Sequence, residues 1–192
     1  MTGSASFDPT GAYRYALRRG TGLGASGPGG AGARSVCFVL LNPSTADARR
    51  DDPTIRRCVG FARAWGLGAV EVVNLCAWRS TEPRELAAAA RRGIDVVGPG
   101  NARAVRRAAG RAGLVVAGWG AWGGRLGLGG AMLDRLAAWA AAGRAGRAAV
   151  LGWTAGGEPR HPLYVRGSAR PVAVGSGGAG SERRVAASML SV

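Results

Sequence analysis

Four short polar segments each follow an apolar run of this sequence, and they contain the side chains best suited to chemistry. The segments are Asn42-Pro43-Ser44, Asn74, Trp119-Gly120 and Arg160-His161-Pro162-Leu163-Tyr164. Carboxamides both donate and accept hydrogen bonds, and an imidazole also changes its protonation state near neutral pH. These residue types suit hydrogen-bonded recognition and proton-coupled chemistry on a small polar group.

Each of these residues also has a purely structural interpretation. Asn42, which precedes Pro43, is a typical turn former. Asn74 could satisfy backbone groups at the end of a strand, since buried polar groups are usually paired. His161 is the only histidine and could be a structural residue beside Pro162. Their placement at the ends of successive apolar runs favours the functional interpretation of the set.

Other residues offer different chemistry. Three carboxylates, Asp47, Asp51 and Asp52, could hold Mg²⁺ for phosphate chemistry, because hard cations prefer carboxylate oxygens. Arg56 and Arg57 follow on a predicted helix and either contact phosphates or form a solvated helix face. The sequence lacks the Gly-x-Ser-x-Gly turn that presents a nucleophilic serine, which argues against nucleophilic catalysis by Ser44. The Gly-rich segment at 118–124 fits neither dinucleotide-binding nor P-loop patterns, which favours close backbone packing or a pocket wall.

The elements that must position these residues alternate along the chain. Apolar runs at 35–41, 69–75, 114–118 and 148–153 predict four buried strands. Helices are predicted from Asp52-Pro53, from Thr81-Glu82-Pro83, and over 101–112 and 125–142. This alternation predicts a three-layer α/β/α fold with a mostly parallel sheet of about four strands. Ligands bind outside the carboxyl ends of such strands, where the polar segments lie.

The rest of the chain predicts one domain over residues 1–192, with its core at about 13–174. Residues 13–19 could form a short edge strand. A Gly-rich loop is expected at 20–33, a Gly/Ser-rich tail at 175–181 and a short helix at 182–189.

The charge of the chain is strongly asymmetric. Its formal net charge is +15, with 26 cations against 11 acidic residues, and every cation is arginine. Such an excess favours a polyanionic partner, although a generally basic protein without such a partner is the alternative. Three separated cysteines predict neither disulfides nor a zinc site. Without a basic leader or a long apolar run, the chain is expected to be cytoplasmic and not in a membrane.

The ordered strand-end motifs resemble the uracil-DNA glycosylase superfamily. There, Asp or Asn before Pro ends the first core strand, Asn ends the second, Trp-Gly follows the third and a His-Pro loop comes last. The chain is more closely similar to a bacterial family named domain of unknown function 1643, over roughly residues 13–165. That similarity rests on five motifs: residues 41–47, residues 51–58, Val73-Asn74-Leu75, Trp119-Gly120 and residues 159–164.

The glycosylase resemblance implies a nucleobase-directed hydrolase that needs neither a metal nor another cofactor. Asn42 would hold the attacking water, and His161 would hydrogen-bond a base oxygen as that oxygen gains charge. Asn74 would read the amide edge of a base, with Trp119 and Ser44 also in the base pocket. Arg56, Arg57 and Arg160 would bind phosphates. The implied partner is DNA, another nucleic acid or a nucleotide.

The sequence departs from the glycosylase pattern in two places. No single residue is assigned as the aromatic that stacks on an extruded base, because Trp65, Trp78 and Trp122 all remain candidates. Leu163-Tyr164 stands where Ser-Pro often follows His-Pro, which leaves the wedge for base extrusion in question. A non-catalytic nucleic-acid-binding module and the Mg²⁺-dependent phosphate enzyme therefore remain alternatives, and the oligomeric state stays open.

Overall fold

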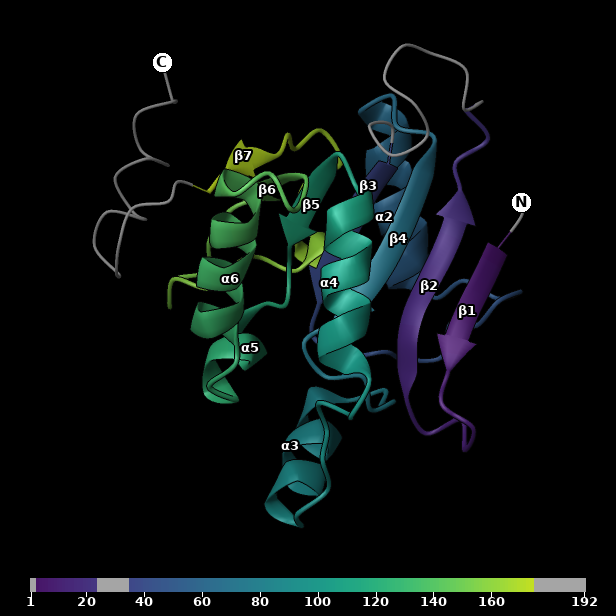
Figure 1. Cartoon of the computed structure of the whole chain (residues 1–192), viewed down its shortest axis with the longest axis vertical. Coiled ribbons are helices and arrows are strands. Elements are labelled where there is room, and N and C mark those ends of the chain that lie inside the picture. The colour runs from purple at the N-terminus through teal and green to yellow at the C-terminus, as the bar shows by residue number, and fades with distance from the viewer. Residues whose placement is uncertain (1–2, 24–34, 175–192) are drawn as a thin grey trace.

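A seven-stranded sheet forms the centre of the molecule in the computed structural model, which describes residues 3–23 and 35–174 (Figure 1). The strands lie in the order β1-β2-β4-β3-β5-β6-β7. Their bounds are Gly3–Phe7 (β1), Arg14–Gly20 (β2), Ser35–Leu40 (β3), Ala69–Asn74 (β4), Leu114–Ala117 (β5), Arg147–Val150 (β6) and Val172–Ala173 (β7).

The four predicted strands are the parallel centre of this sheet. β3 pairs in parallel with β4 on one side and β5 on the other, and β5 pairs in parallel with β6. Their residues are almost entirely buried, which explains the continuous apolar runs of the sequence. The parallel core of an α/β fold is therefore confirmed.

The predicted number of strands was too low. β1 and β2 form an antiparallel extension beside β4, and β7 pairs antiparallel with β6. The predicted edge strand at 13–19 corresponds to β2, which is an inner strand because β1 pairs with its outer side. The outer strands escaped prediction because small, exposed residues such as those of β1 carry no strong strand signal.

Helices cover both faces of the sheet and make three layers. One face is covered by α2 (Pro53–Ala64), whose buried residues include Ile55, Cys58 and Phe61. The other face packs against α4 (Asn101–Arg111) and α6 (Gly129–Ala141). Helix α3 (Pro83–Arg91) adds Leu86 and Ala89 to the hydrophobic cluster of that face but lies beyond the strand ends (Figure 1). Short helices α5 (Ala121–Arg125) and η1 (Pro162–Tyr164) follow β5 and β6.

The start of α2 follows its predicted capping signals. Asp52 has extended backbone geometry, and its Oδ1 accepts a hydrogen bond of 2.8 Å from the Ile55 N–H. Pro53 occupies the first turn. The prediction at 81–83 was right for the start of α3 but not for its cap, because Glu82 makes no side-chain capping bond. The predicted helix at 125–142 is interrupted, with α5 ending at Arg125 and α6 beginning at Gly129.

Three predicted segments lie wholly or mostly outside the residues that the structure describes. The tail at 175–181, the helix at 182–189 and most of the loop at 20–33 lie outside the described residues. Within residues 3–23 and 35–174, no helix is both long enough and apolar enough to cross a bilayer. The cysteines Cys37, Cys58 and Cys76 are buried free thiols, as their apolar surroundings in the sequence predicted.

Candidate functional site

A cleft of about 870 Å³ lies at the carboxyl-terminal edge of the parallel strands. Its walls come from segments that follow β3, β4, β5 and β6, together with the first turn of α2 and η1. The lining residues used below are Asn42, Ser44, Asp52, Ser80, Trp119, Trp122, Thr154, Arg160, His161 and Tyr164. From β3 the chain crosses first to β4 and later to β5 on the opposite side, and ligands bind at such a switch point.

Asn42 is fixed on the cleft wall by the backbone around it. Its Nδ2 donates hydrogen bonds to the Ser80 carbonyl at 2.7 Å and to the Pro43 carbonyl at 3.0 Å. Two carbonyl partners identify this atom as the amide nitrogen and use both of its hydrogens. In the described part of the chain no hydrogen bond uses Oδ1, so this oxygen is available as an acceptor. Ser44 lies two residues further along the same wall.

His161 enters the cleft from the segment that follows β6. The Leu163 N–H donates to its Nδ1 over 3.4 Å, so the proton of the neutral ring belongs on Nε2. Burial lowers the pKa of His161 to about 4, and the nearby Asp52 carboxylate offsets this shift only in part. His161 is therefore neutral at pH 7, with an N–H donor on Nε2.

Trp119 follows β5 and is only 2% exposed, although its ring reaches the cleft wall. Its Nε1 donates a hydrogen bond of 2.5 Å to the Glu158 carboxylate. Gly129 lies close to this pair: a Cβ there would stand 2.2 Å from Glu158 Oε2 and 2.7 Å from Trp119 Nε1. The absence of a side chain at Gly129 therefore leaves room for the hydrogen bond between Glu158 and the Trp119 indole.

The glycines around Trp119 also seat the His161 segment. A Cβ on Gly118 would lie 3.1 Å from Pro162 Cδ, and Gly120 has a φ of 69° and donates its N–H to the Pro159 carbonyl. Positive φ is readily adopted by glycine alone. The Gly-rich segment at 118–124 thus provides close backbone packing and part of a pocket wall, the structural interpretation given to it from the sequence.

Asn74 is not among the residues that line the cleft. It ends β4 on the same face as Val70 and Val72, which pack against α2, and it is 2% exposed. Within the described chain neither polar atom of its carboxamide has a hydrogen-bond partner. Asn74 therefore stands apart from the cleft-lining residues, and its role in base binding stays a prediction.

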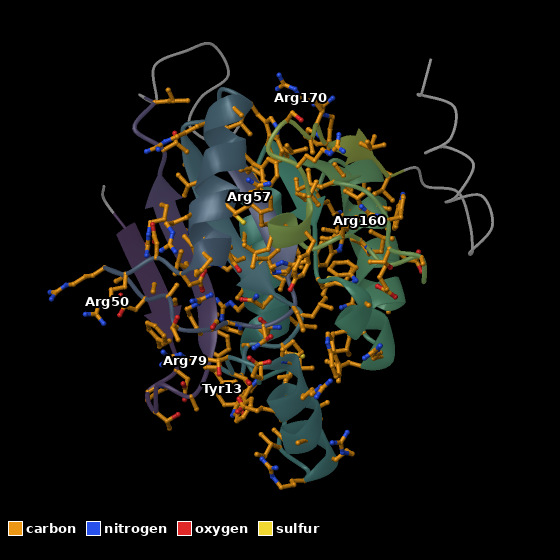
Figure 2. All side chains as sticks on the ribbon, turned by 180° about the vertical axis from the view of Figure 1, so that it is seen from behind. Tyr13, Arg50, Arg57, Arg79, Arg160 and Arg170 are labelled. Atoms are coloured by element: carbon orange, nitrogen blue, oxygen red, sulfur yellow. The ribbon has the colours of Figure 1, made fainter. Side chains whose placement is uncertain are left out.

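The three predicted phosphate-binding arginines have different surroundings. Arg57 donates from Nε to the Pro162 carbonyl at 3.4 Å and from Nη2 to the Val165 carbonyl, so it holds the His161 segment against α2. Arg56 donates to the Asp51 carbonyl. Only Arg160 lines the cleft, where its Nε donates to the Trp153 carbonyl at 2.8 Å. Figure 2 views the molecule from the α2 side and shows Arg57 on the helix and Arg160 on a neighbouring segment.

The acidic residues considered for Mg²⁺ each have a separate partner. Asp47 accepts from the N–H groups of Arg49 and Arg50, which lower its pKa, and Asp51 pairs with Arg19 at 2.6 Å. Asp52 caps α2 and alone of the three lines the cleft. Among residues 3–23 and 35–174 no group of three or more His, Cys, Asp or Glu side chains is arranged to hold a metal ion.

Two aromatic residues of the cleft are candidates for stacking on a ligand. Trp122 is half-buried on the wall, with the Arg125 guanidinium 4.9 Å from its ring centroid. Tyr164 is 79% exposed at the rim. The other predicted candidates are engaged elsewhere: Trp65 stacks on Phe38 and Phe61, and Trp78 packs against the hydrophobic cluster on the α4 and α6 face of the sheet.

Sequence reasoning missed Glu158, Thr154 and the place of Tyr164 in the cleft. Glu158 stands three residues before His161 and is half-buried, after exposed residues at 155–157, and nothing in the sequence around it indicates a partner. Its partner Trp119 is 39 residues away in sequence, so only the fold reveals what it does.

Comparison with known proteins places the chain in a family but gives no activity. No curated protein and no solved structure matches it. A family model described as "Protein of unknown function (DUF1643)" matches residues 14–163, which include β2 to β6 and every cleft-lining residue except Tyr164. This chain therefore belongs to the DUF1643 family.

Proposed function

We propose that the cleft hydrolyses the N-glycosidic bond of a nucleobase, in DNA or in a nucleotide derivative, with Asn42 and His161 as its catalytic residues. The observation that carries this proposal is the pairing, in one cleft, of a neutral imidazole whose N–H lies on Nε2 with a carboxamide whose Oδ1 is an open acceptor. One group donates a hydrogen bond to a leaving base, and the other accepts one from a water molecule.

The reaction requires these two functions. Water forms a bond to C1′ of the sugar through its oxygen and loses a proton to solvent, while the C1′–N bond breaks and its electron pair leaves with the base. Negative charge then grows on a ring carbonyl oxygen until the base takes up a proton from solvent. A donor already in place opposite that oxygen stabilises the transition state by roughly 3 kcal/mol.

The cleft residues support these roles in different ways. Asn42 cannot remove a proton, so its Oδ1 orients the water by accepting one of its hydrogens. His161 acts as a neutral donor, because its low pKa prevents it from carrying a proton at pH 7. Trp122 and Tyr164 supply ring surfaces for the base, and Arg160 offers a cation for a phosphate. Asn74 has no part in this arrangement.

A panel of oligonucleotides tests the proposal. Single- and double-stranded DNA containing uracil, hypoxanthine or alkylated bases, and the corresponding nucleotides, would be incubated at low salt with the full chain. Free base and abasic sites are the measured products. We expect Asn42→Ala and His161→Asn each to slow release by about 100-fold or more.

The variants are chosen so that loss of activity is not loss of folding. Asn at position 161 keeps an acceptor for the Leu163 N–H, and Arg135→Ala, at an exposed position of α6, is the control that should keep full activity. Unfolding curves would be recorded for all three. Absence of base release from every substrate by the unaltered protein would overturn the proposal. Binding that Asn42→Ala leaves intact, without base release, would instead favour a nucleic-acid-binding module.

A further inference from the structure

A second concave surface lies on the opposite edge of the sheet from the cleft, between α4 and the antiparallel strands. Two adjoining cavities of about 630 and 280 Å³ share Ser4, Arg18, Glu71 and Arg111 in their walls. We call their combined surface the α4 groove. Its other lining residues include Ser6, Tyr15 and Arg107, while Gly20, Ser35 and Ala69 mark its end at the start of β3 and β4.

The α4 groove exists because the helices leave part of the sheet uncovered. α4 packs against β4 and the inner side of β2, while β1 extends the sheet beyond it, as Figure 1 shows. On this face the described part of β1 presents Ser4 and Ser6, both exposed, beside Arg18 of β2. β1 therefore contributes two hydroxyl groups to the floor and no large apolar side chain.

One carboxylate organises the cations of the groove. Glu71 of β4 is 9% exposed, and its Oε1 accepts from Arg18 Nε at 3.2 Å and from Arg111 Nη2 at 2.7 Å. Both arginines remain about half exposed. Because one anion holds two guanidinium groups from opposite walls, the groove keeps a net positive charge with its cations already positioned.

The helix wall continues this positive charge. α4 contains Arg103, Arg106, Arg107 and Arg111 and no acidic residue. Arg107 and Arg111, the two that line the groove, are four residues apart, so they share one side of the helix at an interval of about 6 Å. Neighbouring phosphates of an extended nucleic-acid strand are separated by a similar distance. A regular polyanion therefore fits this wall better than a single small anion does.

The dimensions of the groove favour one strand. Its two parts together enclose about 630 and 280 Å³ between a helix and a β-ribbon, which is far too little for a duplex. Tyr15 stands at one end, half-buried and stacked on Tyr13 with ring centroids 6.4 Å apart. A basic groove with an aromatic beside it is the usual arrangement for binding single strands without regard to sequence.

We propose that the α4 groove binds the phosphodiester backbone of single-stranded DNA. Arg18, Arg107 and Arg111 contact phosphates, Ser4 and Ser6 donate hydrogen bonds to phosphate oxygens, and the bases face outward or stack near Tyr15. The choice of DNA over RNA rests on the function proposed for the cleft. The proposed phosphate contacts do not depend on that function. None of the groove residues is among the arginines predicted from the sequence to bind phosphate, Arg56, Arg57 and Arg160. Arg57 instead holds the segment that contains His161.

Fluorescence anisotropy with labelled oligothymidylate tests the proposal on the full chain. This probe lacks uracil and every other base proposed as a cleft substrate. With three phosphates neutralised, log K should fall with log salt with a slope of about −2. Arg107→Ala should reduce the magnitude of that slope by about 0.7. Arg107→Glu should weaken binding at least about tenfold at low salt, because it replaces an attraction with a repulsion.

Matched variants separate this site from the overall charge and from the cleft. Arg135→Glu makes the same change in net charge at an exposed position of α6 and should alter affinity less than about twofold. Ser6→Glu puts a carboxylate on the groove floor without altering a helix and should weaken binding as Arg107→Glu does. Asn42→Ala should bind normally. A failed glycosylase assay would remove the reason for preferring DNA to RNA but would leave the proposed phosphate contacts standing.

The following outcomes would overturn the proposal that the α4 groove binds single-stranded DNA. Equal losses in Arg107→Glu and Arg135→Glu would mean non-specific attraction to a basic protein. A strong loss in Asn42→Ala would place the strand in the cleft. Competition by polyglutamate as effective as that by DNA, or tighter binding of the duplex or of oligouridylate, would show that the occupant is another polyanion.

Discussion

Trp119 illustrates how a single buried residue depends on a distant polar partner. Its ring is 2% exposed, and its indole N–H donates to the Glu158 carboxylate at 2.5 Å. An N–H left unpaired in such a place costs free energy, because it has lost its hydrogen bonds to water. Glu158 is therefore a positioning residue for the wall of the cleft and not only a residue of a turn.

Replacing Glu158 tests this dependence. Glu158→Ala should lower the free energy of unfolding by about 1–3 kcal/mol, because Trp119 Nε1 then stays buried without an acceptor. Glu158→Gln should cost less, since its amide oxygen still accepts the bond. Denaturant unfolding followed by tryptophan fluorescence measures both values. Equal stability of the Ala variant and the unaltered protein would contradict the role assigned to Glu158.

His161 makes the stability of the fold depend on pH. Its pKa in the folded protein is about 4, below the ordinary value of 6.5, because it is buried. Between these values the unfolded chain binds a proton that the folded chain does not. The free energy of unfolding should therefore fall as the pH drops from about 6.5 to 4, by up to roughly 3 kcal/mol.

The control for this prediction is His161→Asn, which keeps an acceptor for the Leu163 N–H but does not titrate. Denaturation curves at closely spaced pH values should show that the decrease between pH 6.5 and 4 is smaller in this variant. The lowered pKa values of Asp8 and Asp47 also reduce stability as the pH falls below about 5, because the unfolded carboxylates then bind protons first, and this contribution is common to both proteins. The same decrease in both proteins would rule out His161 as its source.

At the scale of elements, the helices and strands that were predicted correctly are those with a strong signal in their own residues. Asp52 and Pro53 identify the start of α2 because a cap and a fixed φ act within one turn of helix. β3 to β6 were recognised because strands buried on both faces must be apolar throughout. β1 was not, since its Gly, Ser and Ala residues pair through the backbone and contribute little to the core.

The first turn of α6 provides an adjacent pair of glycines with opposite requirements. A Cβ at Gly129 would lie 2.2 Å from Glu158 Oε2, whereas a Cβ at Gly130 would meet nothing within 4 Å. Gly129→Ala should therefore destabilise the protein by about 1–3 kcal/mol through overpacking. Gly130→Ala should be neutral or stabilising by up to about 1 kcal/mol, because alanine favours helix.

Midpoints of urea unfolding measure both glycine variants. Near-ultraviolet circular dichroism would report whether the Trp119 ring moves in Gly129→Ala, since that ring lies against the added methyl group. If both substitutions had the same effect, the close packing of Glu158 and Trp119 against α6 would not be what requires glycine at position 129.

At the scale of the whole molecule, the order of the strands determined which site predictions placed residues together. Asn42, Ser44, Trp119, Arg160 and His161 follow β3, β5 and β6, and the fold brings all five to one cleft. Asn74 ends β4 but lies among the buried residues of the sheet. The rule that ligands bind at strand ends identifies an edge of the sheet, not the direction of each side chain.

The interior of the whole fold also controls the reactivity of its three thiols. Cys37, Cys58 and Cys76 are buried, and burial raises the pKa of each; that of Cys76 reaches about 12. Only a thiolate reacts quickly with an aromatic disulfide reagent. At pH 8 we therefore expect no rapid reaction in the folded protein, and reaction of three equivalents of thiol in denaturant.

Because the three cysteines lie in β3, in α2 and just after β4, their slow reactions should share one rate, that of global unfolding. A thiol that reacts much faster than the other two would instead identify an element that opens independently of the rest of the molecule.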